Sequence, residues 1–106
     1  MPKVRALTQL SRLEIEQLFK KARTKFKKNG LEIRLAPRSL DYGRLLIVIP
    51  KKSGKAAQRN QIRRRIKSIF YEEKLFEMSF DWIIFVRKEG INLPFNVLKE
   101  ILLSLV

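Results

Sequence analysis

Residues 51–70 read KKSGKAAQRNQIRRRIKSIF, a segment that combines dense positive charge with the spacing of a packed helix. The segment carries eight Lys or Arg residues and no acidic residue. Its apolar residues recur at steps of three and four, so they share one helical sector. This sector consists of Ile62, Ile66, Ile69 and Phe70. We therefore expect a helix from Ala56 to about Lys74 that packs this sector against a sheet.

The polar positions of this helix form a second sector beside the apolar one. The sector contains Asn60, Arg63, Arg64 and Lys67. Arg59 lies between the two sectors near the helix start, and Arg65 lies on the opposite flank. Because the neighbouring apolar sector is expected to be buried, these side chains should be held on a rigid surface.

The start of the same helix is a candidate phosphate site. Gly54 and Lys55 stand where the chain turns from a strand into the helix, and Lys51 and Lys52 precede them. A helix N-terminus offers free N–H groups and the positive end of the helix dipole, which suit a phosphate. The segment lacks the pattern G-x-x-x-x-G-K-[ST], so a nucleoside triphosphate site is not indicated.

The charge of the whole chain points to a polyanionic partner. The sequence has 24 Lys and Arg residues against 10 Asp and Glu, a formal net charge of +14. A short basic run is usually a solvated face. From Tyr42 to Tyr71, however, nine basic residues occur without a single acid, which favours polyanion binding. Nucleic acid is the first candidate.

The absence of two residue types argues against catalysis by the protein itself. The sequence contains no Cys and no His, which excludes disulfides, thiolate or His-based zinc sites, and Ser-His or Cys-His nucleophile pairs. A two-metal nuclease needs converging carboxylates, and the spacing of the acids does not indicate convergence. The acids considered are Asp41, Glu72, Glu73, Asp81 and Glu89. We predict no catalytic residue, and the sequence leaves open whether the chain ligates a metal.

Length and hydropathy predict one domain over residues 1–106, with residues 1–10 flexible. A chain of 106 residues with 45% hydrophobic content can bury one modest core. The N-terminus lacks the apolar stretch of a signal peptide, and no window approaches the roughly eighteen apolar residues of a membrane span. We expect a cytoplasmic protein without a membrane partner or a small-molecule substrate.

Capping and periodicity predict the remaining elements. Ser11 and Glu14 have the spacing of a capping box, which starts a helix that we expect to end near Gly30. The apolar stripe of this helix is Ile15, Leu18, Phe19, Ala22 and Phe26. The closing helix follows Pro94. Its stripe is Leu98, Ile101, Leu102 and Leu105.

Three segments have the pattern of strands. Residues 31–36 (LEIRLA) alternate as a half-buried strand, residues 44–49 (RLLIVI) form an apolar run expected to be central, and residues 80–86 (FDWIIFV) form a buried strand. The last two flank the basic helix, which predicts a crossover and a parallel pair. An extra strand fits residues 37–44. The sequence thus predicts a small single-domain α+β sandwich with one mostly central sheet, ordered α-β-β(-β)-α-β-α.

Residues 50–70, PKKSGKAAQRNQIRRRIKSIF, resemble the signature of the protein subunit of bacterial ribonuclease P, S-K-K-x-G-x-A-V-x-R-N-x-x-K-R-x-x-R. The segments IEQLFKKA, RLLIVI and FDWIIFVRK resemble the family's first helix and two of its strands, so the likeness spans nearly the whole chain. The residues in register with the signature are Lys51, Lys52, Gly54, Ala56, Arg59, Asn60, Arg64 and the basic residues Arg63 and Lys67.

This resemblance implies a function in tRNA processing. In the family, the protein assists an RNA that performs the catalysis, an endonucleolytic removal of the 5′ leader from precursor tRNA with Mg²⁺ held mainly by the RNA. The implied partners are ribonuclease P RNA and the precursor-tRNA leader. The resemblance also implies a left-handed β-α-β crossover, against the usual right-handed rule.

The resemblance assigns two sets of contact residues. Contacts to the catalytic RNA are implied for Lys55, Arg59, Asn60, Arg63, Arg64 and Lys67. Leader binding, in a cleft between the first helix and the sheet, is implied for Ile15, Phe19, Arg34, Lys51, Lys52, Arg87 and Lys88. Three positions depart from the family pattern: Ile15 is usually aromatic, Ala22 is commonly Gly and Pro50 is usually Ser.

Other interpretations stay open on the sequence alone. A ribosomal or other structural RNA-binding protein would show the same charge and fold class. A DNA-binding protein would place the basic helix in a major groove, but no dimerising heptad follows it. Phe19 fits a core position as well as a leader wall, whereas Phe26 and Trp82 are expected in the core.

Overall fold

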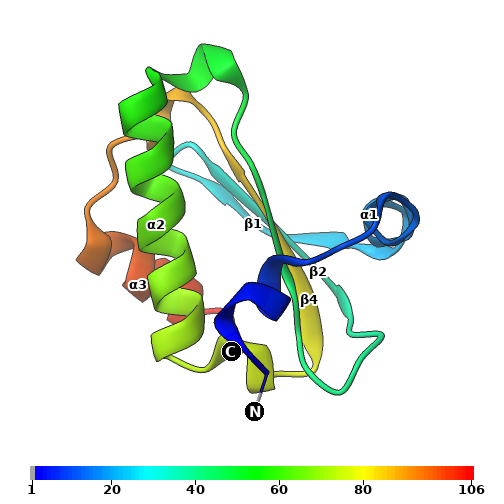
Figure 1. Cartoon of the computed structure of the whole chain (residues 1–106). Helices are drawn as coiled ribbons and strands as arrows, with labels where there is room; N and C mark the ends of the chain where they lie inside the picture. The colour runs from blue at the N-terminus through cyan, green and yellow to red at the C-terminus, as the bar shows by residue number, and fades with distance from the viewer. Residues whose placement is uncertain (1) are drawn as a thin grey trace.

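Strand β4 (Phe80–Val86) lies at the centre of a four-stranded mixed sheet (Figure 1). The computed structural model describes residues 2–106. Strand β4 pairs antiparallel with β2 (Leu31–Pro37) and parallel with β3 (Leu45–Val48), and β1 (Arg23–Lys28) pairs antiparallel with β2. The strand order is β1-β2-β4-β3. The α+β class and the parallel pair around the basic helix are confirmed.

The sheet separates two layers of helices. Helices α2 (Ala56–Glu72) and α3 (Phe95–Leu103) cover one face, and α1 (Arg12–Lys21) lies on the other (Figure 1). Side chains of β4 alternate accordingly: Trp82 and Ile84 enter the larger core, and Ile83 enters the smaller cluster beneath α1. Trp82 is confirmed as a core residue with 0% exposure.

The apolar sector of α2 is buried as the periodicity predicts. Ile62, Ile66 and Ile69 are 0% exposed, and Phe70 packs edge-on against Trp82 with 5.9 Å between ring centroids. Helix α2 ends close to the predicted Lys74, a residue that lies in the left-handed region with φ of 54°.

Strand β3 is an edge strand, so the prediction of a central position is wrong. Its residues alternate between the two cores, with Leu45 and Ile47 on the α2 side and Leu46 and Val48 on the α1 side. The continuous apolar run therefore reflects cover on both faces, by α2 and by the α1 layer. It does not reflect a pairing partner on both edges.

Helix α1 ends at Lys21, nine residues before the predicted end at Gly30, and the next segment is strand β1. Asn29 and Gly30 have positive φ values of 56° and 78°, the geometry of a two-residue hairpin turn between β1 and β2. Phe26 packs on the larger core from β1 and not from the helix. The extra strand thus precedes β2, and none forms between Arg38 and Arg44.

The N-terminal part of α1 is fixed by the predicted capping box. The Ser11 backbone N–H donates to Glu14 Oε1 at 2.9 Å, and the Glu14 N–H donates to Ser11 Oγ at 3.2 Å. Before it, the 3-10 helix η1 (Val4–Thr8) buries Leu7 in the larger core. Met1 lies outside the described residues, and the flexibility expected for residues 1–10 stays a prediction.

Arg44 ties the connections around α1 to the sheet. Its side chain is buried, and it donates to Gln9 O and to Ser39 Oγ, both at 3.1 Å. Its Nη1 lies 2.6 Å from Glu14 Oε2, and its backbone N–H donates to Asp81 Oδ1 at 2.8 Å. Arg44 belongs to the acid-free run of the sequence, yet its role is structural.

The hairpin turn yields a stability prediction. A Cβ at Gly30 would collide with the backbone nitrogen of Gly90, and φ there is positive. We expect Gly30→Ala to lower the free energy of unfolding by roughly 2 to 4 kcal/mol in urea titrations. Asn29→Gly, which keeps the turn geometry, should change it by less than about 1 kcal/mol. Equal effects of the two substitutions would contradict the assigned turn.

Candidate nucleic-acid interface

The first basic surface is the exposed flank of α2, beside its buried isoleucines. Asn60, Arg64 and Lys67 are exposed, and Arg59 and Arg63 are half-buried. Arg63 Nη1 donates to Asn60 Oδ1 at 3.0 Å, which links two neighbouring members. We call this set, with Lys55 at the helix start, the α2 flank: Lys55, Arg59, Asn60, Arg63, Arg64 and Lys67.

The cations of the α2 flank are not neutralised within the protein. Among residues 2–106, the basic partners of ion pairs are Arg12, Arg34, Arg44, Arg87 and Lys99. None of them belongs to the α2 flank. The positive potential of the α2 flank is therefore available to an external polyanion.

Arg65 differs from its neighbours because its side chain is used inside the fold. Its Nη1 donates to the backbone carbonyl of Leu93 at 2.9 Å, which fixes the chain just before α3. This agrees with its predicted place on the opposite flank. Together with Arg44, it shows that a basic run can contain residues that serve the fold alone.

The N-terminal helix η1 extends the α2 flank by a residue that sequence analysis missed. Arg5 and Lys67 line the same hollow of about 380 Å³, whose floor includes Leu45 and Phe70. Helix η1 also packs against β3. No periodicity signals this proximity, because only the tertiary fold brings residues 5 and 67 together.

The second basic surface lies where the parallel strands end. Because β3 and β4 run in the same direction, the residues that follow them meet at one edge of the sheet. The 3-10 helices η2 (Lys51–Ser53) and η4 (Lys88–Gly90) are in contact there. Lys51, Lys52, Arg87 and Lys88 are all exposed at this edge, so the structure brings together four of the residues assigned to leader binding.

Next to this edge, the α1 face of the sheet carries two aromatic rings and a guanidinium group that are in contact. Phe19 of α1 is 38% exposed and lies edge-on to Phe85 of β4, with 6.0 Å between ring centroids. The guanidinium carbon of Arg34 lies 4.7 Å from the Phe85 ring centroid. Ile15, on the same helix as Phe19, is half-buried. Phe19 is thus partly exposed and also packs on the sheet, and its place in the wall of a leader cleft stays a prediction.

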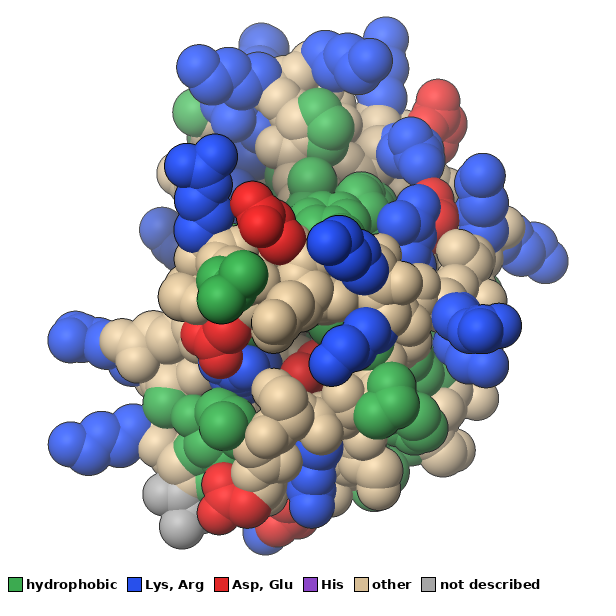
Figure 2. All heavy atoms as spheres, turned by 90° about the vertical axis from the view of Figure 1, so that its right-hand side faces the viewer, with side chains coloured by type: hydrophobic (Ala, Val, Ile, Leu, Met, Phe, Trp, Pro, Cys, Tyr) green, Lys and Arg blue, Asp and Glu red, His purple; other side chains and the backbone are tan. Residues whose placement is uncertain are grey.

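Figure 2 shows the side of the molecule that carries α1. Lys and Arg side chains gather in the upper half and along both sides of this face, with some Asp and Glu among them, and hydrophobic side chains lie exposed between the basic ones. Basic rims around an apolar floor suit single-stranded nucleic acid, because cations contact the backbone while bases stack on apolar groups.

Glu32 is the residue of this face that sequence analysis missed. The residue is 3% exposed, and its carboxylate accepts hydrogen bonds from Arg34 Nε at 2.8 Å, Arg87 Nη2 at 2.9 Å and Thr24 Oγ1 at 3.1 Å. The bond from Arg34, followed by those from Arg87 and Thr24, holds the pKa of Glu32 below its ordinary value. Strand alternation predicts an outward Glu32, but it does not reveal that Thr24 and two arginines surround its carboxylate.

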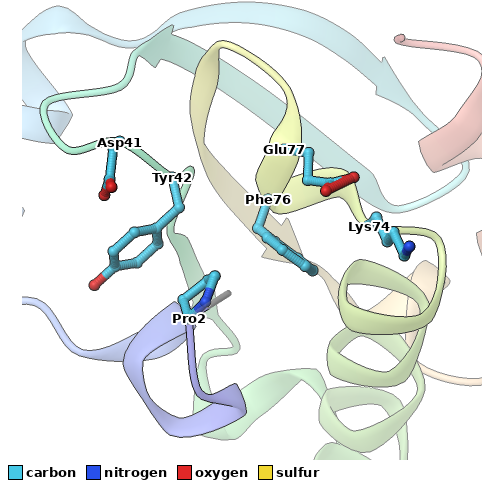
Figure 3. A pocket seen from close by; sticks show the side chains of 6 residues that line it. All are labelled: Pro2, Asp41, Tyr42, Lys74, Phe76 and Glu77. Atoms are coloured by element: carbon cyan, nitrogen blue, oxygen red, sulfur yellow. The ribbon is translucent and has the colours of Figure 1, made fainter.

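A separate pocket of about 600 Å³ lies beside the end of α2 (Figure 3). Tyr42 and Phe76 line it, with Asp41 and Glu77 on either side. No residue of the two basic surfaces contributes to it. Within residues 2–106, no group of three or more acids is placed to hold a metal ion, and no helix there is long and apolar enough to cross a membrane.

By its fold and charge, the chain falls in the class of small basic α+β domains typical of nucleic-acid-binding proteins. The family model described as Ribonuclease P matches residues 1–106, and the chain belongs to this family. It is 35% identical over 98 residues to the ribonuclease P protein component of Borrelia duttonii, which covers 91% of this chain and 85% of the relative. The resemblance found in the sequence is confirmed.

The chain spans 48% to 66% of the length of four other curated relatives, whereas two solved structures match over nearly their whole length. The ribonuclease P protein component of Thermotoga petrophila is 40% identical over 65 residues, 60% of this chain and 48% of the relative. The solved structure of the Thermotoga maritima RNase P protein in complex with 1-(4-fluorophenyl)-2-thiourea is 29% identical, with a TM-score of 0.75 and coverage of 91% and 95%. The Staphylococcus aureus RNase P protein shares the fold, with a TM-score of 0.78 at 21% identity and coverage of 92% and 90%.

The lowered pKa of Glu32 predicts how stability depends on pH. A carboxyl group with a lowered pKa in the folded state stabilises the protein above its unfolded pKa, about 4.3, and loses this effect as pH falls through the folded pKa. We expect Glu32→Gln to lower the free energy of unfolding at pH 7 by about 1 to 3 kcal/mol. The difference from wild type should shrink at pH 3 in urea titrations.

Glu14 does not disturb this comparison. Its pKa is lowered by the Ser11 backbone N–H and by Arg44, but it is present in both proteins. Glu16→Gln, which alters an exposed carboxylate, serves as the control and should show a much smaller change at pH 7. A Glu32→Gln deficit that stays constant from pH 7 to pH 3 would rule out a stabilising carboxylate at this position.

Proposed function

We propose that this chain is the protein subunit of a bacterial-type ribonuclease P, which assists an RNA in removing the 5′ leader from precursor tRNA. The observation that carries the proposal is the α2 flank of a member of this family, whose cations have no acidic partner within residues 2–106. Folded RNA supplies the phosphates that such a surface lacks.

Each of the two basic surfaces binds a different RNA partner. The α2 flank contacts ribonuclease P RNA, because a rigid helix presents its cations at fixed spacing. The face with Phe19, Phe85 and Arg34, and the adjoining edge with Lys51 and Arg87, binds the single-stranded leader. Lys52, Lys88 and Ile15 complete the leader surface. The aromatic groups take bases, and the cations take the phosphates between them.

Catalysis belongs to the RNA, and the protein contributes charge and position. Cations placed where two RNA molecules meet offset phosphate repulsion, so less Mg²⁺ is needed to bring them together. Binding of the leader also fixes the scissile bond relative to the RNA active site. The buried acids Glu32 and Asp81 accept hydrogen bonds inside the protein, so we propose that Mg²⁺ is held mainly by the RNA. The chain would act in the cytoplasm, where precursor tRNA is made.

The decisive experiment measures cleavage of precursor tRNA by a bacterial ribonuclease P RNA at low Mg²⁺, with and without this chain. We expect the chain to restore cleavage at Mg²⁺ concentrations that do not support the RNA alone. We also expect the assembled enzyme to bind precursor tRNA more tightly than mature tRNA, because only the precursor carries the leader.

Two results would contradict this proposal. Absence of rescue, together with association of the chain with ribosomes, would favour a structural RNA-binding role. Equal affinity for precursor and mature tRNA would remove the leader-binding part, even if cleavage is restored. Addition of the chain without the RNA serves as the control and should give no cleavage.

A further inference from the structure

Glu32 is a buried acid on a face that is otherwise built to attract phosphate. An isolated carboxylate there would repel RNA, so its presence needs a cause within the fold. Its two oxygens are divided between two arginines: Oε2 accepts from Arg34 Nε, and Oε1 accepts from Arg87 Nη2. Two guanidinium groups around one carboxylate leave a net positive charge at this place.

The bonds to Glu32 occupy only part of each guanidinium group. Arg34 uses Nε and Arg87 uses one Nη, and no hydrogen bond within residues 2–106 engages the other N–H groups of these two side chains. The side chains are 31% and 54% exposed, respectively. Free N–H groups in a fixed planar fork match the oxygens of a phosphodiester better than a mobile cation does.

The aromatic ring beneath Arg34 adds a second constraint. Phe85 lies opposite Glu32 in the register of β2 and β4 and supports the guanidinium group of Arg34 at 4.7 Å. The guanidinium group therefore lies over a ring, and the side chain is partly exposed to solvent. Unpaired RNA bases stack on guanidinium planes and on aromatic rings, and Phe19 offers a ring beside this position.

We propose that Glu32 is a positioning residue, which holds Arg34 and Arg87 as a rigid pair that binds one unpaired nucleotide of an RNA strand. The phosphodiester contacts the free N–H groups, and the base stacks against the Arg34 and Phe19 surface. This inference rests on the proposed function, because it defines a single-nucleotide subsite within the leader-binding face. Stacking accepts any base, so the subsite selects an unpaired strand and not a sequence.

The test is a double-mutant cycle in the assembled enzyme, made of a bacterial ribonuclease P RNA and the full chain. Dissociation constants for leader-bearing precursor tRNA and for mature tRNA are measured with wild type, Glu32→Gln, Arg34→Lys and the double variant. Arg34→Lys keeps the charge but removes the planar fork and the stacking surface. Lys99→Gln on α3, in the opposite layer, is the charge control.

We expect Arg34→Lys to weaken precursor binding about fivefold or more, and Glu32→Gln about threefold, while mature tRNA affinity changes by less than about twofold. The double variant should lose clearly less than the product of the two single losses, because Glu32 acts through Arg34. A purely structural role of Glu32 would instead lower both affinities together. Lys99→Gln should leave the preference for precursor unchanged.

The possible failures are distinguishable. If wild type shows no preference for precursor tRNA, the proposed function fails and this inference fails with it. If wild type shows the preference and Arg34→Lys keeps it, only the nucleotide subsite is wrong. Multiplicative losses in the double variant, or tighter precursor binding by Glu32→Gln, would overturn the positioning role. Circular dichroism melting confirms that each variant is folded at the assay temperature.

Discussion

The interface depends on one constraint, the burial of an isoleucine ridge along α2 directly beside its cations. Ile62, Ile66 and Ile69 are fully buried, and each contributes about 1.5 to 3 kcal/mol through removal from water. Repulsion between like charges one helical turn apart costs only about 0.2 to 0.5 kcal/mol per pair. The free energy gained by burial therefore outweighs the repulsion between the cations. The helix can hold a strip of cations that form no ion pair with acids of the described protein. The free energy of folding is what keeps this surface ready for a polyanion.

The sheet converts this local arrangement into two surfaces that belong to one protein. The parallel pairing of β3 and β4 places the segments after both strands at the same edge, so η2 with Lys51 and η4 with Lys88 are in contact although they are far apart in sequence. The alternation of β2 and β4 sends Trp82 toward α2 and Phe85 toward α1. A single strand thus supports the helix layer that carries the α2 flank and the aromatic face opposite to it.

Much of this structure is predictable from residue patterns, and the errors have physical causes. The period of α2, the capping box at Ser11 and the crossover between β3 and β4 are all local or nearly local signals, and the structure confirms them. The Asn29–Gly30 dipeptide also carries a local signal, that of a hairpin turn, which the apolar stripe of α1 obscured. The edge position of β3, the internal roles of Arg44 and Arg65, and the enclosure of Glu32 depend on tertiary neighbours. Composition alone counts all basic residues as surface charge.

The salt dependence of affinity for a bacterial ribonuclease P RNA tests the central claim most directly. If the chain neutralises roughly six phosphates, the logarithm of the association constant should fall with the logarithm of salt concentration with a slope near −5. Replacing Arg63, Arg64 and Lys67 together by Gln, a good helix former, should reduce the steepness of that slope by about 3 while the helix content is retained. An unchanged slope in this folded variant would show that the α2 flank does not contact the phosphates of the RNA backbone.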